Sequence, residues 1–197
     1  MELTPDILLS AYCQGIFPMG FEDRNHAPGT IFWYDPNPRA IIPLDTFHVP
    51  RSLQRIIKKG IYEIRYDTAF AQVIRACADT HKGEGVWITP TIVRGYTWLH
   101  KQGFAHSVEA WREGKLVGGL YGVSVRGLFA GESMFSLEPN ASKVALVSLV
   151  EHLRPRNFAL LDTQFMTEHL RRFGTIEITR SEYKERLAAA LQVDTHF

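Results

Sequence analysis

The spacing of apolar residues predicts an orderly succession of strands and helices from about Thr46 to the C-terminus. Apolar residues three and four apart indicate helices, whereas alternation or short apolar runs between glycine-containing turns indicate strands. The predicted elements are a strand at 62–66, helices at about 67–77 and 89–103, strands at 105–111, 115–125 and 127–136, a helix at 140–153, a strand at 157–163, a short helix at 166–173, a strand at 175–179 and a helix at 181–191.

The first 46 residues follow a different pattern. Thr4, Pro5 and Asp6 match the N-cap, first-turn proline and early acidic residue of a helix, which we expect to end at Gly15. Residues 17–43 contain five prolines and are expected to be irregular. We therefore predict an α+β protein with a small loop-rich N-terminal domain, residues 1–46, and a larger domain, residues 47–197. The order of the larger domain, βααβββαβαβ, is that of the GNAT (N-acetyltransferase) fold, but a shared fold does not establish a shared reaction.

Composition indicates an ordinary globular protein. The chain has 197 residues, of which 45% are hydrophobic and 22% charged. No apolar stretch approaches the roughly 18 residues of a membrane span, and the N-terminal residues do not form a basic leader. Cys13 and Cys77 are isolated, without a CxxC motif or a neighbouring histidine cluster. We therefore expect a cytoplasmic protein with no disulfide, no metal site and no membrane partner.

Basic residues gather in one stretch although the net charge of the chain is only +1. Between residues 39 and 65 the chain has six basic and two acidic residues, which gives a local net charge of 6 − 2 = +4. A solvated surface explains this excess, and so does a phosphate-binding patch, because phosphate binding requires the charges to cluster in space. The six are Arg39, Arg51, Arg55, Lys58, Lys59 and Arg65.

The run GLFAGESMFS, residues 127–136, contains an acidic residue among apolar neighbours. Alternation places Ala130, Glu132 and Met134 on one face of the predicted strand, and Phe129, Gly131, Ser133 and Phe135 on the other. A buried carboxylate is costly unless it meets a cation or several hydrogen-bond donors. Glu132 is thus either half of a structural pair with an arginine or part of a site that receives positive charge.

The run FALLDTQ, residues 158–164, is an apolar strand that ends in polar residues. Asp162 and Gln164 are two apart, so the strand should project both to the same side. A carboxylate beside an amide could hold an amine, orient a proton and donate to an oxyanion. Alternatively, Asp162 caps the following helix.

Lys143 stands in the first turn of the predicted helix that Asn140 opens. A cation is unfavourable near the positive end of a helix, so Lys143 should have an anionic partner. This partner is either Glu138 or a bound phosphate, to which Ser142 and backbone N–H groups could also donate.

Aromatic residues and missing motifs narrow the chemistry further. Trp33, Tyr34 and Trp87 lie in or beside turn-rich chain, where they suit either core packing or base stacking. There is no Walker motif, no HExxH and no serine elbow with a triad order. The glycine-rich loop that binds the acetyl-CoA phosphates in N-acetyltransferases is missing as well, so acetyl-CoA is not an expected ligand.

Eleven blocks spread along the chain carry a family resemblance: LLSAYCQGIFPMG, FWYDPNPRAIIPLD, FHVPRSLQR, AFAQVIRACA, WITPTIV, LHKQGFAHSVEAW, KLVGGLYGV, LFAGESMFS, NASKVAL, LLDTQ and EHLRRFG. Together they resemble the leucyl/phenylalanyl-tRNA–protein transferases over nearly the whole chain. The resemblance implies a GNAT-like domain that accepts the 3′ end of an aminoacyl-tRNA in place of acetyl-CoA. It also implies transfer of Leu or Phe, less readily Met, to proteins with N-terminal Arg or Lys. That transfer is expected to need no cofactor, and it marks the modified proteins for N-degron-dependent proteolysis.

The resemblance assigns residues to roles. It implies that Glu132, Asp162 and Gln164 form the catalytic and acceptor-recognition group. The residues it implies at the aminoacyl and 3′-adenosine site are Trp33, Tyr34, Trp87, Leu120, Phe129, Gly131, Met134 and Leu149. Those expected to bind tRNA are Arg39, Arg51, Arg55, Lys58, Lys59 and Lys143.

Positioning can dominate this chemistry, because an aminoacyl ester is already activated and an α-amine with a pKa near 8 is partly neutral at pH 7. We expect Asp162 to hold and orient the incoming α-amine, Gln164 to steady the carbonyl oxygen and Glu132 to attract the cationic acceptor.

The chain departs from the family pattern at three of these positions. Tyr34 stands where a second Trp is frequent, and Leu120 and Leu149 replace Met and Phe of some members. The transferred amino acid is therefore less certain than the reaction. Two other functions fit the sequence: a GNAT-type N-acetyltransferase, and a tRNA-binding module without catalytic activity.

Overall fold

The computed structural model describes residues 2–21, 26–27, 29–80 and 87–197. The helices are α1 (Pro5–Cys13), α2 (Arg51–Lys58), α3 (Phe70–Thr80), α4 (Pro90–Lys101), α5 (Ala141–Leu153), α6 (Glu168–Arg171) and α7 (Arg180–Ala190), and a 3-10 turn, Arg154–Arg156, follows α5. The strands are β1 (Phe17–Phe21), β2 (Thr30–Tyr34), β3 (Arg39–Ile42), β4 (Glu63–Tyr66), β5 (Ala105–Arg112), β6 (Lys115–Val125), β7 (Leu128–Ser136), β8 (Leu160–Gln164) and β9 (Ile176–Ile178). From β4 to β9 the helices and strands follow the predicted order βααβββαβαβ, and the predicted final helix follows as α7. The α+β class is confirmed.

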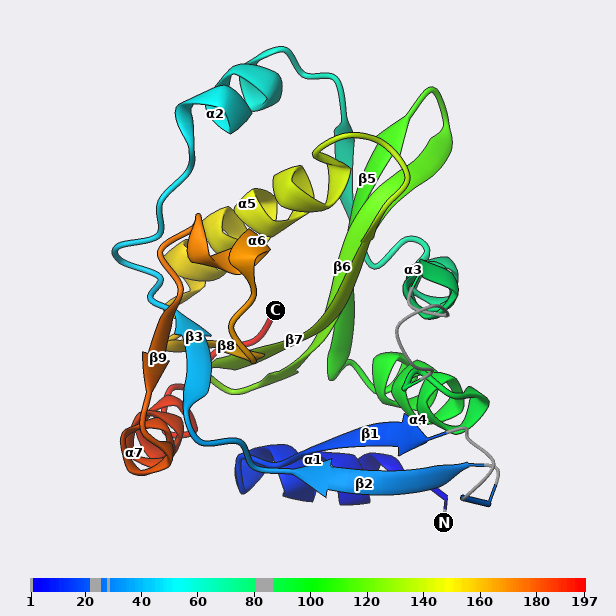
Figure 1. Ribbon diagram of the computed structural model, residues 1–197, viewed down its shortest axis with the longest axis vertical. Coiled ribbons are helices and arrows are strands. Elements are labelled where there is room, and N and C mark those ends of the chain that lie inside the picture. The colour runs from blue at the N-terminus through cyan, green and yellow to red at the C-terminus, as the bar shows by residue number, and fades with distance from the viewer. Residues whose placement is uncertain (1, 22–25, 28, 81–86) are drawn as a thin grey trace.

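Seven strands form one sheet in the order β4-β5-β6-β7-β8-β3-β9 (Figure 1). All pairs are antiparallel except β7 and β8, which are parallel. Pairing between β7 and β8 ends at Ala130 and Asp162, whereas β7 continues to Ser136 alongside β6 alone. The two halves of the sheet therefore separate beyond Ala130.

Helices cover both faces of this sheet. On one face α5 packs with residues of α2 and α6 in a core that includes Leu53, Leu149 and Leu170. On the other face α1, α3 and α4 form a second core with Leu8, Ile74 and Ile92. α7 packs on that same face beside β8 and β3, where Tyr183 and Leu187 meet Ile41 and Leu160. Figure 1 shows α5 on one side of the sheet and α3 and α4 on the other.

The helix starts follow from the sequence. The Oγ1 atoms of Thr4 and Thr89 accept hydrogen bonds from the backbone N–H groups of Ile7 and Ile92, with a proline at the next position in each case. Glu109 of β5, which is fully buried, accepts from the N–H of Ala69 at 2.7 Å and thereby satisfies a donor at the start of α3.

The N-terminal segment is more regular than its prolines predict. Within residues 17–43, outside 22–25 and 28, which the structure does not describe, β1 and β2 form a two-stranded antiparallel ribbon. Pro18 is tolerated because β1 has only one strand neighbour. β3 lies in the large sheet between β8 and β9, although the predicted boundary at 46 assigned it to the N-terminal domain. The amphipathic helix α2 was missed by the prediction; its N-cap, Pro50, makes no side-chain cap bond.

None of the helices in the described ranges is long and apolar enough to cross a membrane.

Close packing of β6 on β7 leaves no room for a side chain at Gly122. A Cβ atom there would lie 2.4 Å from the carbonyl oxygen of Ala130. We predict that Gly122→Ala lowers the free energy of unfolding by about 1–3 kcal/mol in chemical denaturation. Gly131→Ala is the matched control, because its Cβ would meet nothing closer than the Asp162 carbonyl oxygen at 3.6 Å. An equal loss in both variants would contradict this packing argument.

Candidate active site

A β-bulge in β7 fixes where Glu132 points. In the pairing with β6, Tyr121 lies opposite Ser133 and Gly122 opposite Gly131, so Glu132 is an extra residue on β7. The extra residue reverses the alternation beyond it. Ala130 and Phe135 therefore share the core under α3 and α4, whereas Phe129 and Met134 share the core under α5. The predicted common face of Ala130, Glu132 and Met134 is wrong for this reason.

A cavity of about 530 Å³ opens beside the bulge, where β7 and β8 separate. Its apolar wall comes from β6, β7, α5 and β8 and includes Leu120, Met134, Leu146, Leu149 and Leu161. Glu132 and Gln164 also line it, together with hydroxyl-bearing side chains from both faces of the sheet. One cavity thus joins an apolar wall to a carboxylate and an amide.

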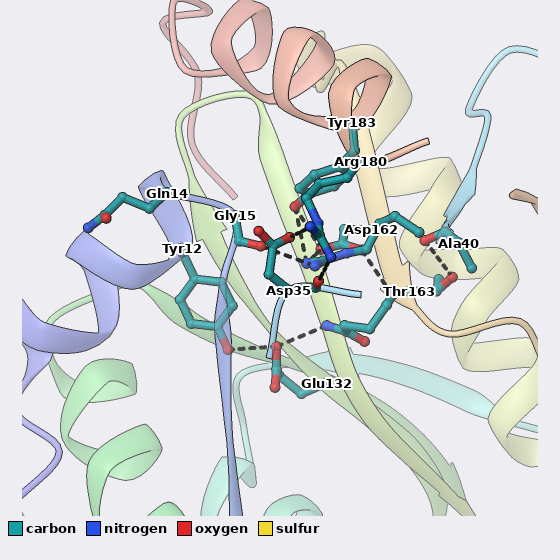
Figure 2. A network of polar contacts seen from close by, with 12 residues as sticks. Tyr12, Gln14, Gly15, Asp35, Ala40, Glu132, Asp162, Thr163, Arg180 and Tyr183 are labelled. Carbon is teal, nitrogen blue, oxygen red and sulfur yellow. Dashed lines mark hydrogen bonds and ion pairs between the residues drawn. The ribbon is translucent and has the colours of Figure 1, made fainter. Parts of the chain in front are cut away.

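Three donors converge on the Glu132 carboxylate. Its Oε1 accepts from the Tyr12 hydroxyl at 2.7 Å and from Gln164 Nε2 at 3.2 Å, and its Oε2 accepts from the Tyr96 hydroxyl at 3.1 Å. The hydroxyls of Tyr12 and Tyr96 are also in hydrogen-bond contact with each other. Figure 2 shows Tyr12 reaching Glu132 from α1. The partners of Glu132 are hydroxyls and an amide, so its alternative interpretation as half of an arginine pair is wrong.

Burial dominates the acidity of Glu132. It raises the pKa of this carboxyl from its ordinary value to about 7. The hydrogen bonds from Tyr12 and Tyr96 lower the pKa, the charge of Asp162 raises it and that of Arg39 lowers it. Glu132 therefore changes its charge near neutral pH.

The negative charge of Asp162 is balanced by an arginine. It has no exposed surface, and its Oδ1 and Oδ2 accept from Arg39 Nε at 2.9 Å and Nη2 at 2.6 Å. The Tyr183 hydroxyl donates to Oδ2 at 2.9 Å, and the backbone N–H of Gln164 donates to Oδ1 at 2.9 Å (Figure 2). Arg39 also donates to the Gly15 carbonyl at 3.1 Å. Four donors enclose the carboxylate in a bidentate ion pair.

The side chains of Asp162 and Gln164 do not project to the same side of β8, contrary to the prediction. The β3–β8 register places Ala40 opposite Gln164 and Ile41 opposite Asp162, so Thr163 is an extra residue. Gln164 has a left-handed backbone with φ of 58°. Asp162 consequently points to Tyr183 of α7, whereas Gln164 turns into the cavity. The alternative role of Asp162 as a helix cap is also wrong, because the Thr167 side chain caps α6.

Comparison with known proteins places this site in a family. A family model described as leucyl/phenylalanyl-tRNA protein transferase matches residues 41–188, and a model of the N-terminal domain of the same transferase matches residues 1–37. The chain belongs to the leucyl/phenylalanyl-tRNA–protein transferase family. A transferase so named from Herpetosiphon aurantiacus is 55% identical over 197 residues, covering 100% of this chain and 98% of the relative. Another, from Salinibacter ruber, is 52% identical over 98% of this chain and 82% of the relative.

Solved structures resemble the chain more distantly. L-PGS from Bacillus licheniformis aligns with a TM-score of 0.46 at 14% identity, over 77% of this chain and 56% of that one. A likeness of this size carries no argument about activity.

The structure brings together most of the aminoacyl-site residues expected of a leucyl/phenylalanyl-tRNA–protein transferase. Trp87, Leu120, Gly131, Met134 and Leu149 line the cavity. The remaining three do not appear among its lining residues: Phe129 is fully buried in the core, Trp33 lines a separate groove against α1, and Tyr34 stacks on Phe17 with ring centroids 5.9 Å apart.

The expected tRNA-binding cations divide into three groups. The first is Arg39, which is 1% exposed and bound to Asp162, so its expected role as a surface cation is wrong. The second is the basic face of α2, formed by the exposed side chains of Arg51, Arg55, Lys58 and Lys59. The third is Lys143, whose Nζ donates to Asn140 Oδ1 at 3.1 Å.

The first turn of α5 offers little to a phosphate. The N–H groups of Ala141, Ser142 and Val144 donate to Glu138, Ser136 and Asn140 respectively. Most of the backbone donors that a bound anion would use are therefore already satisfied.

Sequence reasoning missed several side chains of the site, among them Leu146 and Leu161 of the apolar wall. Tyr12, Tyr96 and Tyr183 donate to its carboxylates, and Phe165, which is 46% exposed, lines the cavity next to Gln164. A signal for the tyrosines was present, because a tyrosine on the buried face of a helix needs a partner for its hydroxyl.

We predict that Arg39→Met lowers the free energy of unfolding by about 3–5 kcal/mol, because it leaves the Asp162 carboxylate buried without a counter-charge. Combining it with Asp162→Asn should recover part of that loss, and chemical denaturation of both variants measures the recovery. Strictly additive losses would contradict the ion-pair account.

We predict that Glu132→Gln stabilises the fold more at pH 8 than at pH 5. The folded-state pKa of Glu132 is raised, so the folded protein binds the proton more tightly than the unfolded chain, and stability falls as pH rises from about 4.5 through 7. Above that window the wild type loses about 3 kcal/mol, which Gln avoids. Thermal denaturation at both pH values measures the difference, and an equal effect at both would contradict the raised pKa.

Proposed function

We propose that this chain transfers leucine or phenylalanine, and less readily methionine, from aminoacyl-tRNA to the N-terminal Arg or Lys of proteins. The observation that carries the proposal is the joining, in one cavity, of an apolar wall and the Glu132 carboxylate. The modification marks its protein substrates for N-degron-dependent proteolysis in the cytoplasm. Membership of the family and relatives of that name support this reaction.

The apolar wall suits the transferred side chain. Leu120, Met134, Leu146, Leu149 and Leu161 present only aliphatic and thioether groups. An aliphatic, thioether or aromatic side chain gains from burial against them, whereas a charged one loses its hydration without a partner. This supports Leu, Phe and Met as donors over charged amino acids.

Glu132 suits the acceptor. Its carboxylate lies within the cavity, and no arginine or lysine of the described residues is bound to it. A protein with N-terminal Arg or Lys brings two positive charges, on its side chain and its α-amine. Attraction between these charges and Glu132 favours such acceptors over those with an acidic or neutral first residue.

Asp162 acts through Gln164 in this proposal. Four donors enclose the carboxylate, so it does not hold the acceptor amine as the sequence led us to expect. Instead it fixes the Gln164 backbone in its left-handed conformation. The Gln164 amide then lies where it can steady the carbonyl oxygen of the ester. The ester is already activated, and the reaction needs no ATP and no cofactor.

The basic face of α2 is our candidate for tRNA contact. Arg51, Arg55, Lys58 and Lys59 are exposed, and none forms an ion pair with a residue that the structure describes. Such unpaired cations suit a phosphate backbone.

The adenosine-stacking role of Trp87, with Trp33 and Tyr34 nearby, remains a prediction, as does the division at residue 46. The mixed sheet with one parallel pair and helices on both faces supports a GNAT-like fold for residues 47–197. We propose aminoacyl-tRNA, and not acetyl-CoA, as its donor.

The direct test supplies labelled Leu-tRNA, Phe-tRNA and Met-tRNA with peptides that begin with Arg, Lys, Asp or Ala. We expect label on the Arg and Lys peptides, most from Leu-tRNA and Phe-tRNA. Label on none of the peptides would overturn the proposal. Binding of charged tRNA without transfer would favour a silent tRNA-binding module, and acetylation from acetyl-CoA would favour an acetyltransferase.

Reversing charge on α2 should weaken tRNA binding alone. We predict that Arg55→Glu combined with Lys58→Glu raises KM for aminoacyl-tRNA about tenfold or more, flattens its salt dependence and leaves KM for the acceptor peptide unchanged. Lys115→Glu, an exposed cation at the turn between β5 and β6, is the control and should change neither. Similar losses in both variants would mean that α2 is not the contact surface.

A further inference from the structure

The Tyr12–Tyr96–Glu132 cluster has more contacts than an ionised carboxylate can satisfy. Its four contacts join Tyr12 to Tyr96, each tyrosine to Glu132, and Gln164 to Glu132. With Glu132 ionised, two hydroxyl protons and one amide proton serve these four contacts. With Glu132 protonated, its own proton serves the fourth. The cluster can therefore take up a proton and keep every hydrogen bond.

The neighbouring groups are poorly suited to accept a proton. Asp162 is enclosed by four donors, and Gln164 is a neutral amide. Among the described residues that line the cavity, the titratable side chains besides Glu132 are Tyr121 and His169. Burial raises the pKa of Tyr121 well above its ordinary value, so its hydroxyl stays protonated. Burial and the charges of Lys143 and Arg172 lower the pKa of His169, so its imidazole is a weaker base than the Glu132 carboxylate.

We propose that Glu132 is the general base of the transfer, with Tyr12 and Tyr96 as the positioning residues that hold its carboxylate. This role rests on the proposed function. It goes beyond charge attraction, because a base must take a proton in each turnover and release it afterwards.

The proton moves as follows. The acceptor arrives as an α-ammonium ion and gives one proton to the Glu132 carboxylate, which becomes a carboxylic acid. The neutral amine nitrogen then forms a bond to the ester carbonyl carbon. As the bond between that carbon and the tRNA ribose oxygen breaks, a second proton passes from the nitrogen to the departing oxygen. Glu132 finally releases its proton to solvent, so the reaction yields an amide, a free tRNA hydroxyl and one proton.

The acidity of Glu132 agrees with this role. Its pKa of about 7 is near that of an α-amine, which favours proton transfer between them at neutral pH. The titratable and charged groups that face it come from five elements: Tyr12 of α1, Tyr96 of α4, Tyr121 of β6, Asp162 of β8 and Arg39 of β3. Removal of either positioning hydroxyl takes a donor from the anion and should raise the pKa further.

The first test compares two acceptors in wild type and Glu132→Gln, with labelled Phe-tRNA as donor. One is a peptide beginning with Arg, protonated at pH 7; the other is methoxyamine, a weakly basic amine that is already neutral. We expect Glu132→Gln to lower kcat with the peptide about 100-fold or more and to leave transfer to methoxyamine within about threefold. A rise in KM for the peptide with unchanged kcat would mean attraction only and would overturn the role.

The second test follows kcat/KM for the Arg peptide against pH. The wild-type rate should rise with pH through a midpoint near 7, and Tyr12→Phe and Tyr96→Phe should each move that midpoint upward. Tyr62→Phe, which loses a hydroxyl bonded to the Pro139 carbonyl, is the matched control and should leave the midpoint unchanged. A lower rate with an unmoved midpoint in the first two variants would show structural support alone and would contradict the proposal.

These outcomes separate the two levels of the account. If the wild-type protein transfers to no amine at all, the proposed function is overturned, and the role of Glu132 as general base is overturned with it. Wild-type transfer that Glu132→Gln retains equally with both acceptors would overturn the base and leave the transfer reaction intact.

Discussion

The constraint on which the rest of the site depends is a pair of carboxylates, buried Asp162 and partly buried Glu132, on either side of one glutamine. Asp162 is matched by the charge of Arg39 and stays enclosed. Glu132 faces the cavity, and its partners among the described residues are hydroxyls and an amide. A buried carboxylate without a cation is unfavourable, and such strain is typical of a functional position. Gln164 connects the two, through its backbone on one side and its side chain on the other.

The constraint ties distant parts of the chain together. Tyr12 of α1 and Arg39 of β3 come from the first 46 residues, yet both end in the network around β7 and β8. The N-terminal segment is therefore a structural part of the site and not an appendage. Two local irregularities make the geometry possible: the bulge at Glu132, and the extra residue at Thr163 before left-handed Gln164. Both occur where β7 and β8 part, so neither interrupts the pairing of the two strands.

Much of the fold could be predicted from local patterns, because helix caps such as Thr89-Pro90 and the apolar runs of β5 and β6 between turn residues act within a few residues. The prediction failed for elements whose structure depends on packing against residues distant in the sequence. β1 tolerates Pro18 because β2 is the one strand paired with it among the described residues. α2 is held by apolar contacts with the core under α5 and not by a polar cap.

The site was predictable to a similar degree. Glu132 and Gln164 could be identified because a polar residue in an apolar strand needs an explanation. The direction in which their side chains point could not be predicted. One extra residue reverses the alternation of a strand, and the sequence does not show which residues pair between strands. The partners Tyr12 and Tyr96 were missed because they lie 120 and 36 residues away in the chain.

The most direct measurement of the central claim is an NMR titration of protein labelled with ¹³C at the glutamate side-chain carboxyl carbons, with Glu132→Gln used to assign the Glu132 signal. We expect a midpoint of about 7 for this carbon, well above the ordinary range of exposed glutamates. A midpoint between about 4 and 5 would show that the hydroxyl cluster holds an ordinary carboxylate and would contradict the account.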